Sequence, residues 1–328
     1  MRNKGTWAAI FVAILIAAGV LAYHYVPRGT SELTPVSFRL AWVYDMAEVG
    51  VFVAQDENYF RDEGLDVKVE PGGFGSDPIK LVAAGTDDFG VAGAGNLLLA
   101  RAEGVPVVAI GAEFQNTPVG FIVHKGSGIS TFKDFRGKRV GIQTGADTDV
   151  LYRALLARNG MTSADVHEVP IQFDATPFVS DQIDVLPGYV TNQPVTLKSQ
   201  GTSVDVISAA SQGLNYYGNV YFTSERMLRE HPERVREFLS AVRRGWTTAF
   251  ENEPAAIRAI QHKTSDFNAN DLGLIYKSVV PFIHPDDGDQ LLSMSSQRWD
   301  TTRQVLQDAG LLKSKIDVSA AYTNDFLK

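Results

Sequence analysis

Short apolar segments alternate with amphipathic ones after residue 35, and this alternation restricts the fold more than any other feature. DFGVA at 88–92 and VPVVAIGA at 105–112 are nearly continuous apolar runs, as expected of strands buried on both faces of a parallel sheet. VSFRLAWV at 36–43 and LDVKVE at 65–70 alternate apolar with polar residues, as strands do. Residues 49–64 have helical apolar spacing and end at a glycine, a helix-stop signal. These patterns predict an α/β fold.

A second series of the same kind begins near residue 120, and the chain is mainly helical from Ser224 onward. The length of 328 residues allows two domains. We therefore predict two α/β lobes and a helical C-terminal region. The predicted strands of the second series lie at 120–125, 137–145, 167–171, 183–188 and 204–209, and its predicted helix lies at 147–160.

The N-terminal segment has the charge pattern of a secretory signal. Arg2 and Lys4 precede an uncharged apolar stretch at 5–22, and this order is typical of exported proteins. The stretch is short for a membrane span, which needs about 20 residues. We expect residues 1–26 to be a cleaved signal peptide, with an uncleaved membrane anchor as the alternative. A lipid anchor is excluded because the chain has no cysteine.

Composition excludes several classes of function. The absence of cysteine rules out disulfides, thiolate nucleophiles and cysteine-bound zinc. The net charge of −8 argues against a nucleic acid partner. The six histidines lack metal-ligand spacing and there is no G-x-S-x-G motif. We interpret the acid pairs Asp87–Asp88 and Asp286–Asp287 as solvated turn residues, and we expect no catalytic residue, no metal and no cofactor.

The segment GVAGAGNLLL at 90–99 joins a predicted strand to a predicted helix through closely spaced glycines. It fits neither common phosphate-binding motif, because no Lys-Ser/Thr follows Gly95 and Leu98 replaces a third glycine. Glycine here allows a tight turn. Alternatively, free amides at the helix start contact a ligand, with Gly93, Ala94 and Asn96 lining the site.

Other polar and aromatic residues lie in loops that follow predicted strands, where open α/β sheets bind ligands. Helix capping is the alternative explanation for the threonines and asparagines, and core packing for the tryptophan. Tyr216 and Tyr217 point to opposite faces of an extended chain, so at most one is expected to face a ligand. These further ligand-binding candidates are Trp42, Tyr44, Glu48, Asn116, Thr144, Thr148, Tyr189, Asn192, Gln193, Asn215, Tyr216 and Tyr217.

Over residues 36–260 the chain resembles the NMT1/thiamine-pyrimidine-synthase-like (SsuA/THI5-like) family of ABC transporter substrate-binding proteins. The matching segments, in order, are LAWVYDMAEVGVFVAQDENYFRDEGLDVKV, LVAAGTDDFGVAG, ARAEGVPVVAIGA, FKDFRGKRVGI and HPERVREFLSAV. The resemblance implies a type II periplasmic-binding fold with ligand in a cleft between two lobes. Lobe 1 would comprise 36–121 and 220–328, and lobe 2 would comprise 122–219. The hinge strands would be GFIVHK and NVYFTS.

Within the family, VEPGGFGSDP, GYVTNQP and YYGNVYF are most similar to the branch that binds riboflavin or thiamine pyrimidine precursors. The resemblance implies a periplasmic, monomeric, non-enzymatic protein that closes on a small aromatic heterocycle and delivers it to an ABC permease with its ATPase. Membrane contact would be limited to the N-terminal segment or the permease. The family's usual Asn-Glu-Pro is Asn192–Gln193–Pro194 here, so one charge is absent.

Two alternative functions stay open. The family also contains a thiamine-pyrimidine synthase, whose reactive lysine and histidine would fall at Ala92 and Asn96. Its cysteine-rich motif would fall at 213–217, in a chain without cysteine, so the resemblance disfavours this enzyme. If residues 1–26 remain attached as an anchor, the protein would be a membrane-tethered ligand sensor.

Overall fold

The computed structural model describes residues 32–73, 75–172, 174–284 and 290–327. Residues 35–328 form one compact unit. The signal or anchor expected at 1–26 lies outside the described residues. Within the described ranges, no helix is both long enough and apolar enough to cross a membrane.

The first sheet has five strands in the order β2-β1-β3-β10-β4, and we call this sheet with its helices lobe 1. β10 comes from far along the sequence and lies antiparallel between β3 and β4, so the sheet is mixed. The strands are β1 (Thr34–Arg39), β2 (Leu65–Glu70), β3 (Phe89–Gly93), β4 (Val107–Ala112) and β10 (Asn219–Ser224). β1 ends before the predicted strand does, because the chain bends after Leu40, whose amide bonds to the Glu70 carbonyl at 2.9 Å.

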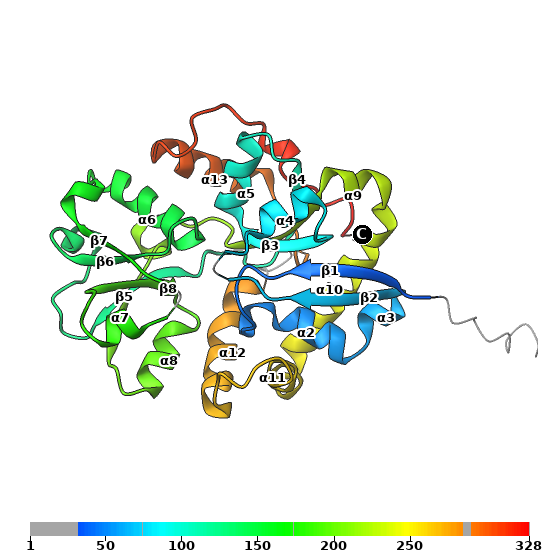
Figure 1. The fold of residues 1–328 in the computed structure, drawn as a ribbon, viewed down its shortest axis with the longest axis horizontal. Coiled ribbons are helices and arrows are strands. Elements are labelled where there is room, and N and C mark those ends of the chain that lie inside the picture. Colours follow the sequence, from blue (N-terminus) through cyan, green and yellow to red (C-terminus); the bar gives the residue numbers. More distant parts are fainter. Residues whose placement is uncertain (1–31, 74, 173, 285–289, 328) are drawn as a thin grey trace, which may run out of the picture. The chain divides into compact units, whose positions relative to one another are not determined.

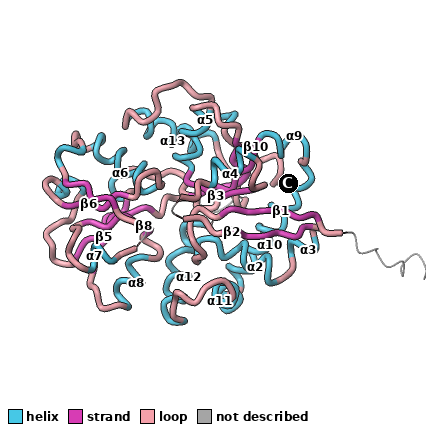
Figure 2. Tube along the Cα trace, viewed as in Figure 1, coloured by secondary structure: helices cyan, strands magenta, loops and turns pink. Residues whose placement is uncertain are grey.

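Helices cover both faces of this sheet (Figures 1 and 2). One face packs against α2 (Val49–Asp56), α3 (Tyr59–Asp62), α9 (Glu225–Glu230), α10 (Pro232–Glu251), α11 (Glu253–Gln261) and α12 (Ala269–Ile283). The other packs against α4 (Pro78–Ala84), α5 (Ala94–Ala102) and α13 (Ser296–Asp308), with a 3-10 turn, η5, at Val318–Ala320. The single helix predicted at 49–64 is two helices, since Asn58 takes a left-handed conformation with φ of 60°.

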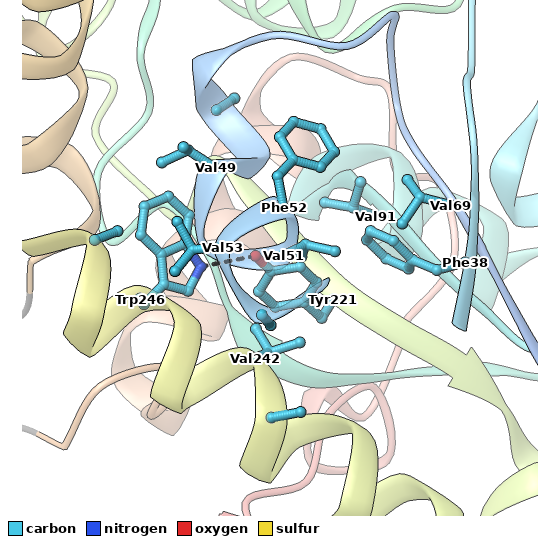
Figure 3. Packing of buried hydrophobic residues seen from close by; sticks show 14 of the residues in the cluster. Phe38, Val49, Val51, Phe52, Val53, Val69, Val91, Tyr221, Val242 and Trp246 are labelled. Atoms are coloured by element: carbon cyan, nitrogen blue, oxygen red, sulfur yellow. Dashed lines mark hydrogen bonds between the residues drawn. The ribbon is translucent and has the colours of Figure 1, made fainter. Parts of the chain in front are cut away.

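Aromatic residues and glycines build the core between α2, α10 and the sheet. Trp246 Nε1 donates to the Tyr221 hydroxyl at 2.9 Å, so this buried indole has a polar partner (Figure 3). The helices cross where two glycines meet. A Cβ at Gly245 would lie 1.9 Å from the Gly50 carbonyl oxygen, so larger residues would separate α2 from α10.

The second sheet, with its helices, is lobe 2, and its strand order is β7-β6-β8-β5-β9. Its strands are β5 (Val119–His124), β6 (Arg139–Ile142), β7 (His167–Pro170), β8 (Val185–Tyr189) and β9 (Val204–Ser208). Figure 1 shows α6 (Asp147–Arg158) on one face and α7 (Thr176–Val179) and α8 (Gln193–Ser199) on the other. Short 3-10 turns lie at η2 (Phe132–Phe135), η3 (Ser163–Asp165) and η4 (Ala210–Gln212).

The chain passes between the sheets twice, after Ala112 and again after Ser208. β5 belongs to the second sheet over its whole length, and β10 to the first. The predicted lobe limits of 36–121 with 220–328, and 122–219, stay a prediction. The two α/β lobes and the helical C-terminal region themselves are present as predicted.

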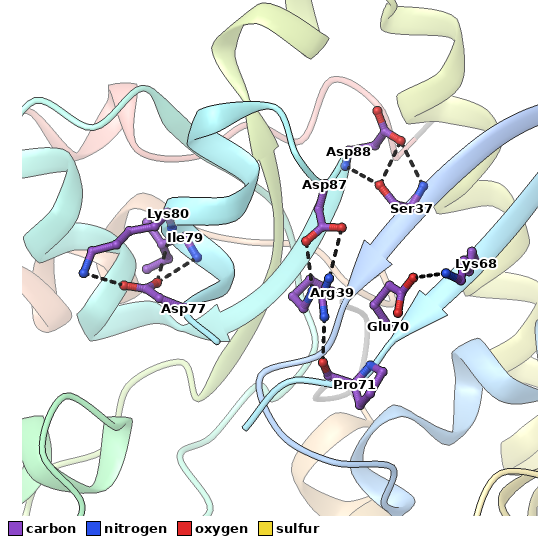
Figure 4. A network of polar contacts seen from close by, with 10 residues as sticks. All are labelled: Ser37, Arg39, Lys68, Glu70, Pro71, Asp77, Ile79, Lys80, Asp87 and Asp88. Carbon is purple, nitrogen blue, oxygen red and sulfur yellow. Dashed lines mark hydrogen bonds and ion pairs between the residues drawn. The ribbon is translucent and has the colours of Figure 1, made fainter. Parts of the chain in front are cut away.

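The pair Asp87–Asp88 is not a solvated turn, and that interpretation was wrong. Asp87 is only 5% exposed and accepts from Arg39 Nε at 2.9 Å. Asp88 Oδ2 accepts from the Ser37 amide at 2.9 Å (Figure 4). Both acids therefore join β1 to the start of β3, because β1 carries their partners. Asp286–Asp287 lies outside the described residues.

Candidate ligand-binding site

Each sheet presents the carboxyl ends of its parallel strands at one edge, and the candidate residues follow those ends. In lobe 1, η1 (Met46–Glu48) follows β1, α5 begins directly after β3, and Glu113 follows β4. In lobe 2, α6 begins after β6 and α8 after β8. Ligands of open α/β sheets bind beyond such ends. A ligand is therefore expected near these five segments.

The two lobes meet at two glycines, Gly93 at the end of β3 and Gly95 in the first turn of α5. A Cβ at Gly93 would lie 2.6 Å from Asp147 Oδ1, at the start of α6. A Cβ at Gly95 would lie 3.0 Å from the Tyr216 hydroxyl. Glycine is required here because lobe 2 side chains approach the backbone of lobe 1 closely. These glycines thus form a contact surface between the lobes.

Two hydrogen bonds strengthen this contact between the lobes. In the first turn of α5, Asn96 Nδ2 donates to the Gly145 carbonyl at 2.7 Å. The Tyr189 hydroxyl, at the end of β8, donates to Asn219 Oδ1 at 3.0 Å. Both bonds join side chains near strand ends of one lobe to groups of the other, so strand-end residues of both lobes lie together.

Four buried carboxyl groups lie at these strand ends, and we call them the acid cluster: Asp45, Glu48, Glu113 and Asp147. Asp45 and Asp147 are 9% exposed, Glu48 2% and Glu113 0%. Their oxygens are only partly bonded. Asp45 accepts from the Ala47 amide at 2.6 Å, and Glu113 Oε1 from the Tyr221 hydroxyl at 2.6 Å. Glu48 Oε2, Glu113 Oε2 and both Asp147 oxygens have no partner in the protein.

Burial disfavours the charged form of each acid. It raises the pKa of Glu113 to about 8, of Asp147 to about 7 and of Asp45 to about 6. The pKa of Glu48 rises well above its ordinary value, first through burial and then through the nearby charges of Glu113 and Asp45. Among the described residues, no Lys, Arg or His offsets these shifts.

Tyr189 lies among the four acids. Burial raises its pKa well above the ordinary value, and the charges of Asp147, Glu48, Asp45 and Glu113 add to that effect. Its ring makes an edge contact with Phe114, with centroids 6.0 Å apart. One aromatic residue thus links the acids of lobe 1 to the acid of lobe 2.

The structure brings some predicted site residues to the acid cluster. Glu48 belongs to it, and the Asn192 side chain lies close enough to Asp45 to lower the pKa of that acid. Gly93 and Tyr189 contact it as described above. Tyr216 is fully buried, its hydroxyl has no partner, and Asp147 raises its pKa in addition to burial. These residues come from both lobes.

Other predicted site residues have partners inside one lobe. Tyr44 donates to the Val69 carbonyl at 3.3 Å, and the Ala94 amide to the Gly218 carbonyl at 2.8 Å. Thr148 donates to Gln143 at 2.9 Å. Gln193 Oε1 accepts from the Tyr189 amide at 2.8 Å. Thr144 is exposed beside Gly145.

The remaining candidates lie around the crossing segments and the end of β1. The Tyr217 hydroxyl accepts from the Ser295 amide at 2.8 Å, so this tyrosine turns toward lobe 1 and away from the acids. Asn215 donates to Asn116 at 2.8 Å. Trp42 is half-buried, and a Cβ at Gly73 would lie 3.5 Å from its ring.

Sequence reasoning did not single out Asp45, Glu113, Asp147 or Asn219 as site residues. One signal was available for Glu113, because it is an acid placed directly after the apolar run of β4. Asp147 looked like an ordinary acid in the first turn of a helix. In the described part of the chain, no group of three or more His, Cys, Asp and Glu could hold a metal ion.

Comparisons with known proteins agree with this architecture. The riboflavin-binding protein RibY of Chloroflexus aurantiacus is 29% identical over 312 residues, which cover 92% of this chain and 88% of that protein. A 4-amino-5-hydroxymethyl-2-methylpyrimidine phosphate synthase of Legionella pneumophila is 26% identical, covering 89% of this chain and 92% of the synthase.

Among solved structures, the alkanesulfonate-binding protein SsuA of Xanthomonas axonopodis pv. citri superimposes with a TM-score of 0.70 at 16% identity, covering 89% of this chain and 99% of that one. The fold is therefore that of the periplasmic binding proteins, as predicted. The NMT1/THI5-like family model matches residues 46–256. With more than half of its length matched, the chain belongs to the NMT1/THI5-like family.

Proposed function

We propose that this protein is an exported solute-binding protein of an ABC importer, acting in the periplasm. Its ligand is a small aromatic heterocyclic nutrient, of the riboflavin or thiamine-pyrimidine-precursor kind. The observation that carries the proposal is the meeting of unpartnered, buried polar groups from both lobes at their strand ends. Asp147 and Tyr216 of lobe 2 lie there against Gly93 and Gly95 of lobe 1.

Such groups are costly to bury without partners, and a ligand held between the lobes supplies partners to both at once. The rings of Tyr189 and Tyr216 offer surfaces for a flat heterocycle. The side-chain amides of Asn96 and Asn192 can form hydrogen bonds with the polar edge of the heterocycle. Asn96 Oδ1 is available for such a bond because it is buried without a partner. The RibY relative, named for riboflavin, supports a ligand of this size and shape.

Binding and release follow from movement of one lobe against the other. The two crossing segments, 113–118 and 209–218, would act as the hinge, next to the predicted hinge strands. A ligand shifts the open–closed equilibrium only by its difference in affinity for the two forms. The closed form makes contacts from both lobes, so the ligand favours it. A permease with its ATPase would receive the closed, monomeric protein.

The relatives named as pyrimidine phosphate synthases raise an enzyme as the second candidate. The residues present do not fit a pyridoxal phosphate site of that type. Ala92 is 6% exposed and packs in the apolar cluster between the sheet and α5. Asn96, where a histidine would be needed, bonds to Gly145. We therefore propose that the protein is not an enzyme. A membrane-tethered sensor is the alternative function, and it requires residues 1–26 to stay attached.

A thermal-shift screen tests this proposal. The compounds are riboflavin, 4-amino-5-hydroxymethyl-2-methylpyrimidine, an alkanesulfonate and pyridoxal phosphate. Riboflavin or the pyrimidine should raise the melting temperature, because a ligand at about 100 times its Kd adds about 2.7 kcal/mol of stability. A shift with pyridoxal phosphate alone, together with its visible absorbance, would refute the proposed binding protein. Mass spectrometry of the mature N-terminus distinguishes the exported form from the tethered one.

A further inference from the structure

The acid cluster lacks the positive charge that this fold supplies to a buried acid elsewhere. Asp87 is 5% exposed and is paired with Arg39 at 2.9 Å, where it joins two strands (Figure 4). The four cluster acids are equally buried, yet no ion pair of the described residues includes them. A structural role therefore does not explain them in the way it explains Asp87.

Among the described residues of lobe 1, the groups that contact the cluster acids are neutral or are other acids of the cluster. From the first turn of η1, the Ala47 amide bonds Asp45. From β10, the Tyr221 hydroxyl donates to Glu113 Oε1, and the Asn219 side chain lies close enough to lower the pKa of Glu113. The Glu48 and Asp45 side chains lie close enough to shift each other's pKa, and two carboxylates at close range repel each other. The described residues of lobe 1 thus place no cation in an ion pair with these acids.

Lobe 2 contributes Asn192, Tyr189, Tyr216 and Asp147, of which only Asp147 ionises near neutral pH. The Tyr216 hydroxyl is an independent sign of a ligand, since it is fully buried, has no partner and is not itself one of the acids. It lies within the field of Asp147. Two tyrosine rings and four acids together form the surroundings that an organic cation prefers, through charge and through the faces of the rings.

We propose that the ligand held between the lobes carries a positive charge, which Asp45, Glu48, Glu113 and Asp147 neutralise. The inference rests on the proposed function and narrows it to a cationic heterocycle. An inorganic ion is not favoured, because no three of the described His, Cys, Asp and Glu residues are placed to hold one. Tyr189, which lies in the field of all four acids, would contact the cationic part of the ligand.

Proton release follows from this arrangement. The buried acids hold protons near neutral pH, since burial raises the pKa of Asp147 to about 7 and that of Glu113 to about 8. A bound cation favours the ionised acids and lowers these pKa values. Binding therefore releases protons, and the affinity rises with pH by about tenfold per pH unit for each proton released. A neutral ligand would leave the protons in place.

Isothermal titration calorimetry of the full chain tests the proposal with a matched pair of compounds. These are 4-amino-5-hydroxymethyl-2-methylpyrimidine and its 5-aminomethyl analogue. The first has a neutral hydroxyl group at the position where the second has an ammonium group. Riboflavin is the third compound. Titrations at about pH 6 and about pH 8, each in buffers of different ionisation enthalpy, count the protons released. We expect the aminomethyl compound to bind about tenfold or more tightly than its partner, to release protons, and to bind more tightly at the higher pH.

Two variants that each remove one negative charge distinguish an effect at the binding site from an effect of the net charge of the protein. Asp147→Asn should weaken binding of the aminomethyl compound about 10- to 100-fold, the effect of losing a hydrogen bond to a charged group. Asp66→Asn, on the exposed side of β2, should leave the Kd unchanged. Thermal unfolding without ligand should show both variants folded.

Three results would overturn the inference. Binding of riboflavin or the hydroxymethyl compound as tightly as the aminomethyl compound, without proton release, would leave the proposed function standing and refute the charged ligand. Stabilisation by magnesium or calcium chloride alone, lost in Asp147→Asn, would replace the organic cation by a metal ion. Failure of all three compounds to bind would refute the proposed function and the cationic heterocycle together.

Discussion

Replacing Asp147 by asparagine should make the stability of the protein less dependent on pH between about 4 and 7. Burial raises the pKa of Asp147 from 3.8 to about 7. Because the folded-state pKa lies above the unfolded one, the folded state binds the proton more tightly, and stability falls as pH rises between these two values. Above the folded-state pKa the loss is complete. Asparagine has no proton to lose over this window.

The size of the effect follows from the size of the pKa change. A rise of about three units corresponds to about 4 kcal/mol, at 1.36 kcal/mol per unit. The position of Asp147 in the first turn of α6 offsets part of this, since a helix N-terminus favours a negative charge by about 0.3–1 kcal/mol. Desolvation outweighs this helix effect because neither carboxyl oxygen has a hydrogen-bond donor. The net effect expected is about 3 kcal/mol.

Urea unfolding at about pH 5, 6, 7 and 8 measures this difference. The free energy of unfolding of the wild-type protein should fall across the series, and that of Asp147→Asn should fall by about 2 kcal/mol less, because part of the loss already occurs below about pH 5. The slope with urea should stay constant, so that the midpoint reports stability. Asp66→Asn is the control, because its side chain is exposed. Equal pH dependence in Asp147→Asn and wild type would refute the burial argument.

Three further substitutions give distinct expected results. Gly245→Ala should lower the free energy of unfolding by about 3 kcal/mol or more in urea titrations, because the added Cβ would lie 1.9 Å from the Gly50 carbonyl oxygen; an unchanged midpoint would contradict the close crossing. Gly93→Ala should weaken ligand binding in calorimetry, because its Cβ would lie 2.6 Å from Asp147 Oδ1 and would push the lobes apart. The same variant should lose protection of backbone amides from hydrogen exchange at this contact. Adding Asp147→Ala should restore that protection, because it removes the carboxyl group that the new Cβ would meet. Tyr189→Phe loses the bond to Asn219 and should lower stability by about 1 kcal/mol, and no change in thermal unfolding would count against that bond.

Local patterns were enough to predict most of the elements. The alternation in LDVKVE gave a strand with the observed bounds, Leu65–Glu70, since one face of β2 is buried and the other exposed. The residues of β3 and β4 are buried at every position, which is why nearly continuous apolar runs identified these two strands. The break at Asn58 was missed, because a left-handed residue inside an apolar helical pattern leaves the pattern itself intact.

The site was harder to predict, because it depends on contacts between segments far apart in the sequence. Glu113 and Asp147 can be recognised as site residues only in the folded protein, where both lie near Tyr189. Conversely, Thr148 and Gln193 had the residue types of ligand contacts, and the structure gives them partners inside lobe 2. The local sequence does not distinguish a polar side chain that caps a turn from one that binds a ligand.

Ligand-induced closure of the two lobes is the most direct test of the account. The chain has no cysteine, so a pair introduced as Lys80→Cys in lobe 1 and Gln200→Cys in lobe 2, both exposed positions, accepts two fluorophores specifically. Energy transfer between them should change saturably when riboflavin, 4-amino-5-hydroxymethyl-2-methylpyrimidine or its aminomethyl analogue is added, with the midpoint at the calorimetric Kd. A compound that binds in calorimetry and leaves the transfer efficiency unchanged would contradict a ligand held between closing lobes.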